Sequence, residues 1–317
     1  MKNRIISFLL ATLFSLSVIG CGTKDTKEQD AYRQYGITCM ESGKYEDAVK
    51  AFQNALGESI GHIGEKELDI CFYKAKAQAL DGKTKDALAT YDAIIKYNKD
   101  ARAYYLRGDL YMDMGEEKEG RADFESAVQH GKKNYEIYIG IYESLSRHEK
   151  KDEGQKYLSA AMEIKGDKPE DELYKGRISY LLGENKDAIS YLEKAKEHKQ
   201  MLASYYLGLA YDANGDSDKA KKCIAEYIKS GVATSYDLYE LGMQEMQDGN
   251  YKNALTYFNS GLELEKVPNK QNLMKSAIAA YEYSGDFDSA KKMIKEYLKA
   301  YPDDEEAKHE NTFLETR

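Results

Sequence analysis

Tryptophan is absent from this chain, and proline, cysteine and histidine are scarce: the 317 residues include no Trp, three Pro, four Cys and five His. So few prolines, with abundant Ala, Leu, Lys and Glu, favour a helical protein. The cysteines form no CxxC pair, and no histidine lies four residues from a cysteine or another histidine, so the sequence indicates no metal site and no cofactor. We predict an all-α chain.

Three cysteines fall within apolar helical patterns and are expected to be small buried residues: Cys39, Cys71 and Cys223. A disulfide between Cys39 and Cys71 stays open, because the sequence does not show whether their geometry allows one.

A basic excess is also missing. The formal net charge is −9, and without residues 1–20, which contain Lys2 and Arg4 and no acid, 44 basic residues face 55 acidic ones. Nucleic acids and anionic lipid surfaces require a basic footprint, so neither is an expected partner. We interpret the many charges as solvated helix faces.

Long apolar runs are confined to the N-terminus. Lys2 and Arg4 precede a mostly apolar run from Ile5 to Ile19, the pattern of an export signal peptide. The run has about fifteen residues, fewer than the roughly 20 needed to cross a bilayer, which argues against a permanent transmembrane helix.

The four residues that end this run, Val18 to Cys21, resemble the lipobox of bacterial lipoproteins. The resemblance implies that Cys21 becomes the lipidated first residue of the mature chain; an ordinary secretory signal beside an unmodified Cys21 is the alternative. Two acyl chains hold a protein stably on a bilayer. We therefore expect a cleaved signal peptide at 1–20, a polar tether at 21–30 and a location in the cell envelope, on the outer face of the cytoplasmic membrane or on an outer membrane.

The rest of the chain repeats one motif: Gly, two residues, an acid or Lys, one residue, then a small residue. Seven copies and a degenerate eighth begin at Gly43, Gly82, Gly115, Glu149, Gly183, Gly215, Gly249 and Gly285. The intervals are 39, 33, 34, 34, 32, 34 and 36 residues. A period near 34 indicates stacked supersecondary units.

With its aromatic, Gly, Tyr, Ala and Phe positions, this pattern resembles the tetratricopeptide repeat. Repeat three carries it as Tyr104, Gly108, Tyr111, Phe124 and Ala127. The resemblance implies an α-solenoid of about eight helix-turn-helix repeats over residues 31–302, with a capping helix in 303–317 and the first helix of each repeat lining a concave groove.

Two sets of residues are expected to pack where the helices meet. Glycines of the first helices let the second helix approach closely, as do small residues after each turn. A bulky position on the second helix is expected to be core: Phe52, Tyr91, Phe124, Leu158, Leu192, Ile224, Phe258 and Ile294. Repeats three and four depart from the pattern, with Glu149 at the turn and Gly120 and Gly154 where Ala is usual.

Catalytic patterns fail on context. Gly82-Lys83-Thr84 resembles the end of a phosphate-binding loop, but Ala77 replaces the first Gly of that motif. Acidic pairs fall at turns and helix starts, where acids suit the helix dipole, and none is expected in an apolar setting that would raise its pKa. We do not expect an enzyme.

The expected function is a membrane-anchored, extracytoplasmic scaffold that binds an envelope protein or peptide in its groove; an assembly factor for outer-membrane or pilus components is the alternative. The groove is not expected to hold a basic clamp for a carboxylate. Its predicted contact residues are apolar: Tyr105, Met112, Tyr205, Leu209, Tyr236, Tyr239, Met243 and Met246. Coverage of these residues by neighbouring repeats or the capping helix is the alternative.

Overall fold

The computed structural model describes residues 27–59, 63–166 and 168–317. These residues form 17 α-helices and no β-strand, which confirms the all-α prediction. They divide into an N-terminal unit, within Lys24–Val232, and a C-terminal unit, Ala233–Arg317. The predicted signal peptide and Cys21 lie outside the described residues.

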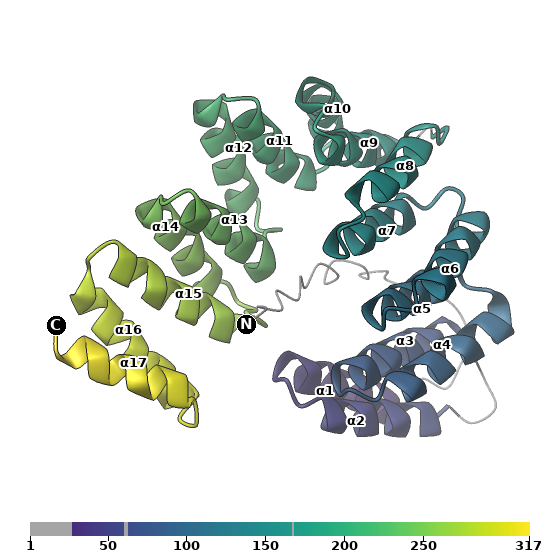
Figure 1. Cartoon of the computed structure of the whole chain (residues 1–317), viewed down its shortest axis with the longest axis horizontal. Coiled ribbons are helices and arrows are strands. Elements are labelled where there is room, and N and C mark those ends of the chain that lie inside the picture. Colours follow the sequence, from purple (N-terminus) through teal and green to yellow (C-terminus); the bar gives the residue numbers. More distant parts are fainter. Residues whose placement is uncertain (1–26, 60–62, 167) are drawn as a thin grey trace. The chain divides into compact units, whose positions relative to one another are not determined.

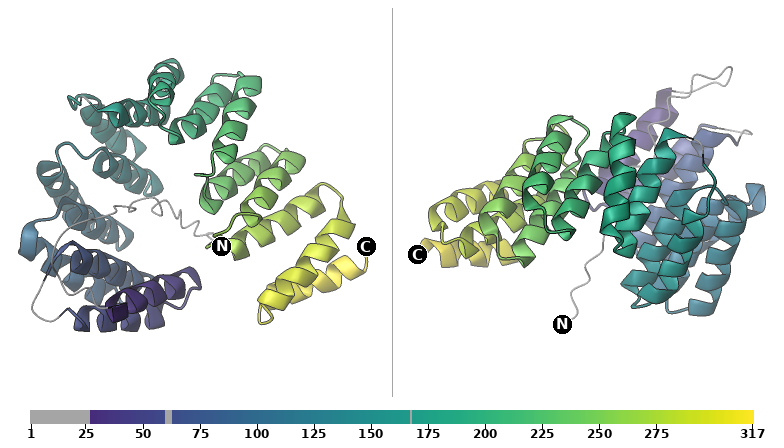
Figure 2. Two further views of the ribbon diagram at one scale, coloured as in Figure 1. Left: turned by 180° about the vertical axis from the view of Figure 1, so that it is seen from behind. Right: turned by 90° about the horizontal axis from the view of Figure 1, so that it is seen from above.

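The N-terminal unit contains six helix pairs: α1 (Lys27–Glu41) and α2 (Tyr45–Gly57), α3 (Glu65–Leu80) and α4 (Thr84–Asn98), α5 (Ala101–Asp113) and α6 (Glu117–His130), α7 (Tyr135–Arg147) and α8 (Lys151–Met162), α9 (Pro169–Leu182) and α10 (Asn185–Glu197), α11 (Leu202–Ala213) and α12 (Ser217–Lys229). The C-terminal unit contains two pairs and a last helix: α13 (Ser235–Gln247) and α14 (Tyr251–Leu262), α15 (Lys270–Tyr283) and α16 (Phe287–Ala300), α17 (Glu305–Glu315). The members of each pair lie side by side, as Figures 1 and 2 show.

The turn inside each pair has one repeated geometry. The seven turn glycines adopt φ values between +70° and +84°, the left-handed region that costs other residues energy. The residue after each turn position donates its N–H to a carbonyl five residues earlier, as Lys44 does to Cys39 at 2.8 Å and Asp286 to Tyr281 at 2.9 Å. This bond closes the first helix and starts the second.

The degenerate turn keeps the same geometry without glycine. Glu149 adopts φ +62°, and the Lys150 N–H still donates to the Leu145 carbonyl at 2.8 Å. The repeat with the degenerate turn therefore has the same structure as the others, and Glu149 holds a strained left-handed conformation in it.

We expect Glu149→Gly to stabilise the N-terminal unit by about 0.5–1 kcal/mol, because glycine removes the penalty of the left-handed conformation. Chemical denaturation followed by circular dichroism checks this. The control is Lys133→Gly, in the turn before α7, because φ is not positive at Lys133; a similar gain there would contradict the explanation.

The predicted close approach within pairs is also observed. An ideal Cβ placed on Gly36 would lie 2.6 Å from the Phe52 ring, and one on Gly208 would lie 2.4 Å from Ile224 Cδ1. The eight bulky second-helix positions are at most 5% exposed. They are core, as predicted.

Glycines in repeats three and four accommodate larger neighbours. An ideal Cβ on Gly120 would lie 2.8 Å from the Met112 sulfur, and one on Gly154 would lie 3.0 Å from the Tyr142 ring. Each glycine therefore replaces alanine where the first helix of the same pair fills the space.

One boundary and one cysteine need correction. Helix α1 begins at Lys27, so the polar tether does not extend to residue 30; Gln29 is buried and donates to Glu67 of α3 at 2.9 Å. Cys71 is half-buried, whereas Cys39 and Cys223 are buried, and all three are free thiols. The predicted capping helix is α17, with Asp304 as its N-cap.

No helix among the described residues is both long and apolar enough to cross a membrane.

Candidate partner-binding surface

The predicted contact residues lie on first helices of the pairs, the odd-numbered helices from α1 to α15. Neighbouring first helices contact each other from pair to pair, as α5 does with α7, α9 with α11, and α13 with α15. The predicted residues lie on α5, α11 and α13.

Tyr105 and Met112 of α5 are buried, at 6% and 2% exposure. The prediction that they lie on an open inner face is wrong. The Tyr105 ring occupies the space above Gly140 of the next first helix, where an added Cβ would lie 2.6 Å from its Cζ. Small residues on neighbouring helices thus leave room for both side chains in the core.

Tyr205 and Leu209 of α11 are half-buried. The Tyr205 ring lies 5.3 Å from the ring of Tyr227 and 5.1 Å from that of Tyr206, the latter edge to face. Tyr205 is therefore held by aromatic contacts within its own pair and retains a partly accessible surface.

The remaining four residues share α13: Tyr236, Tyr239, Met243 and Met246 are all half-buried. Tyr239, Met243 and Met246 pack against the core of α14 and α15, and the Tyr239 ring lies 6.2 Å from that of Phe258. The Ser276 hydroxyl of α15 donates to the Met243 sulfur at 3.6 Å. One side of this α13 strip is covered by the next pair, and the other stays accessible.

The first helices of the N-terminal unit carry ion pairs that the sequence analysis missed. Arg33 donates to Asp69 at 2.7 Å, and Arg147 to Asp109 at 2.5 Å. Arg177 of α9 bonds to both Glu136, at 3.2 Å, and Glu143, at 3.0 Å, of α7. Each pair joins two adjacent first helices, so opposite charges spaced about one repeat apart are the signal that would have revealed them.

Burial changes the ionisation of some of these groups. Burial raises the pKa of Glu143, while the adjacent Arg177 lowers it. In the C-terminal unit, burial and the nearby Glu310 raise the pKa of Glu282 to about 7. The sequence analysis considered only the acidic pairs at turns and helix starts, so it did not identify these two carboxyl groups within α7 and α15.

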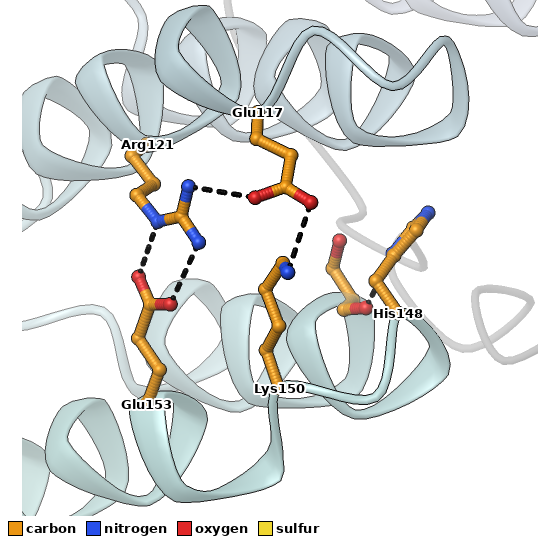
Figure 3. A network of polar contacts seen from close by, with 6 residues as sticks. Glu117, Arg121, His148, Lys150 and Glu153 are labelled. Carbon is orange, nitrogen blue, oxygen red and sulfur yellow. Dashed lines mark hydrogen bonds and ion pairs between the residues drawn. The ribbon is translucent and has the colours of Figure 1, made fainter.

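A second network joins the second helices of repeats three and four (Figure 3). Arg121 of α6 donates to Glu153 of α8 at 2.8 Å and to Glu117 at 3.0 Å, and Lys150 lies 2.9 Å from Glu117. These groups flank Gly120 and Gly154. The network therefore links the two repeats that depart most from the sequence pattern.

Across the described residues, no group of three or more His, Cys, Asp or Glu side chains is arranged to hold a metal ion. His148 Nε2 lies 3.2 Å from Asp113 and its Nδ1 lies 2.8 Å from the Ser144 carbonyl.

The surface of the first helices thus offers aromatic, thioether and paired charged groups.

Comparison with known proteins identifies the repeats. Residues 74–135 match one tetratricopeptide repeat family, and residues 202–230 and 271–304 match a second one. No curated protein is significantly similar to the chain.

Several solved structures are similar to the chain. Yeast Tom70 aligns with a TM-score of 0.51 at 16% identity, over 86% of this chain and 59% of that one. A tetratricopeptide repeat protein from Parabacteroides merdae aligns at 0.47 and 11% identity, over 80% and 99%. PilW, a type IV pilus biogenesis factor, aligns at 0.43 and 17% identity, over 66% and 97%. The likeness to Tom70 concerns the fold alone.

The matched segments lie in both units, and the paired helices and recurring turn extend the same pattern from α1 to α16. The chain is a tetratricopeptide repeat protein.

Proposed function

We propose that this chain is a scaffold that binds a protein or peptide partner, anchored in the cell envelope by a lipid on Cys21, with no catalytic role. The α13 strip, defined as Tyr236, Tyr239, Met243 and Met246, carries the binding part of the proposal, because four aromatic or thioether side chains are half-buried on one first helix. Aromatic and Met side chains are enriched at protein interfaces.

The N-terminal unit supports this choice by contrast. Its first-helix arginines Arg33, Arg147 and Arg177 already pair with acids of adjacent helices, so a partner that bound there through charge would have to replace those pairs. An apolar contact on α13 displaces no ion pair.

We expect Tyr239→Ala and Met246→Ala each to weaken partner binding by about 1–3 kcal/mol, the range for interface anchors. The partner is captured from detergent-solubilised envelope with the full chain, and its affinity for each purified variant is then measured. The matched control is Tyr97→Ala on α4, a tyrosine that is 54% exposed. An equal loss of affinity in the control, or unfolding of the α13 variants, would remove the strip as the binding site.

The anchor rests on the lipobox resemblance at Cys21. Since α1 begins at Lys27, five residues separate it from Cys21. Six residue steps span at most ~20 Å, so the lipid would hold the first repeat close to the membrane surface.

Cys21→Ser is expected to leave an unprocessed precursor or release the chain to the medium, since the lipid is attached through that one sulfur. Labelling cells with a fatty-acid analogue and fractionating their membranes measures this. Cys71→Ser is the matched control and should stay labelled and membrane-bound; label that persists in Cys21→Ser would contradict the anchor.

A further inference from the structure

Helix α17 covers one end of the C-terminal unit through few apolar contacts. Its buried residues are Ala307 and Leu314, which join the core formed by Met274 and Ile278 of α15 and Ile294 of α16. Glu310 and Asn311 occupy the helical turn between Ala307 and Leu314 and are half-buried. The middle of this interface is therefore polar.

Both ends of α17 are held by complementary charges. At its start, Asp304 lies 2.8 Å from Lys275 of α15 and accepts a hydrogen bond from the Tyr297 hydroxyl of α16; Glu306 lies 3.6 Å from the same lysine. At its end, Glu315 lies 3.7 Å from Lys295 of α16.

Other charged groups of α17 do not face its middle turn. Arg317 stacks on Phe287, with its guanidinium carbon 5.8 Å from the ring centre. Lys308 pairs with Glu305 of the same helix, and His309 is exposed. The charges at both ends therefore favour docking at neutral pH.

The middle turn lacks such a complement. Glu310 is the charged neighbour of Glu282 on α15, and Glu282 Oε1 is buried without a hydrogen-bond partner, as is Asn311 Oδ1. Two ionised carboxylates offer acceptors only. A proton on Glu282 supplies the donor that this pair needs.

We propose that α17 is a proton-dependent cap: a proton on Glu282, donated in a hydrogen bond to Glu310, holds α17 on α15 and α16, and loss of that proton loosens α17 and uncovers the apolar face of Met274, Ile278 and Ile294. Once the proton is lost, the ion pairs at the two ends of α17 act against the repulsion between the Glu282 and Glu310 carboxylates. This inference does not depend on the proposed partner or on the lipid anchor.

The direction of the pH effect follows from proton binding. Burial and Glu310 raise the pKa of Glu282 to about 7, above its value in an unfolded chain, so docked α17 binds this proton more tightly than undocked α17. Docking is therefore strongest in mildly acidic solution and weakens as pH rises through about 7. Asp304 acts in the opposite sense, since Lys275 and Tyr297 lower its pKa, and it loses its contacts only in strong acid.

Amide hydrogen exchange of the purified chain in the presence of EDTA tests the cap. We expect the protection factors of α17, corrected for the intrinsic effect of pH on exchange, to fall about tenfold or more between about pH 5.5 and pH 8.5. Those of α9 and α10, which belong to the other unit, should stay constant.

Glu310→Gln separates the proton from the rest of the interface. The glutamine amide N–H can donate to the ionised Glu282 carboxylate, so no titrating proton is needed. The amides of α17 should therefore stay protected from exchange across the whole pH range. Glu315→Gln, which removes an acid outside the pair, should keep the pH-dependent fall. Protection of the unmodified chain that does not change with pH, or a fall that persists in Glu310→Gln, would overturn the proposal.

Discussion

Gly242→Ala is expected to destabilise the C-terminal unit by about 2–3 kcal/mol, although alanine normally favours a helix interior by about 1 kcal/mol. The added methyl carbon would lie 2.2 Å from Cε1 and 2.5 Å from Cδ1 of Phe258. Phe258 is fully buried on α14, so its ring cannot move away without displacing the core it shares with Leu273 and Ala277 of α15.

Gly57→Ala is the matched control for this effect. Gly57 ends α2, and no described atom lies within 4 Å of an added Cβ. We expect this variant to be neutral or slightly stabilising in chemical denaturation. If both variants lowered the unfolding free energy equally, the cause would be glycine loss in general rather than the close approach of α13 and α14.

The sequence predicted the repeats well because each is encoded within a short segment. A turn glycine accepts a positive φ at little cost. The small and bulky residues near it pack against residues of the same pair, as Gly208 and Ile224 do. These contacts depend on spacing within one repeat, which is visible in a single sequence. A capping helix in residues 303–317 was also predicted, and α17 spans Glu305–Glu315.

Accessibility of the first-helix positions was harder to predict because it depends on the next repeat. Tyr105 is buried since Gly140, 35 positions later, leaves room for its ring, whereas Tyr239 stays half-buried at the equivalent position. The ion pairs of Arg147 and Arg177 were missed for the same reason: each partner belongs to another repeat. Glu282 belongs to a repeat and Glu310 to the cap, so no periodic pattern in the sequence indicates this carboxyl pair.

Arg177→Ala should lower the stability of the N-terminal unit by about 2–4 kcal/mol at neutral pH, because it leaves two acids of α7 without their partner. The Arg177 side chain is 11% exposed, and those of Glu136 and Glu143 are 25% and 23% exposed. Its guanidinium carbon also lies 5.5 Å from the ring centre of Tyr206 on α11. One side chain thus links three successive first helices.

The deficit of Arg177→Ala should shrink in acid. Burial raises the pKa of Glu143, and Arg177 opposes that shift, so removing the arginine raises this pKa further. The folded variant then binds a proton more tightly than its unfolded chain does, and its stability falls as pH rises through the folded pKa. Denaturation at about pH 5 and about pH 8 should therefore show the larger difference from the unmodified protein at the higher pH.

Lys50→Ala is the control for a charge pair that lies in solvent. Lys50 and Glu46 are four residues apart on α2, with both side chains 62% exposed, and solvent-exposed pairs of this kind contribute little to stability. An Arg177→Ala deficit as small as that of Lys50→Ala, or one that does not change with pH, would show that the ion pairs between first helices contribute no more than surface charges. A large, pH-dependent deficit would instead assign Arg177 the role of joining α7, α9 and α11.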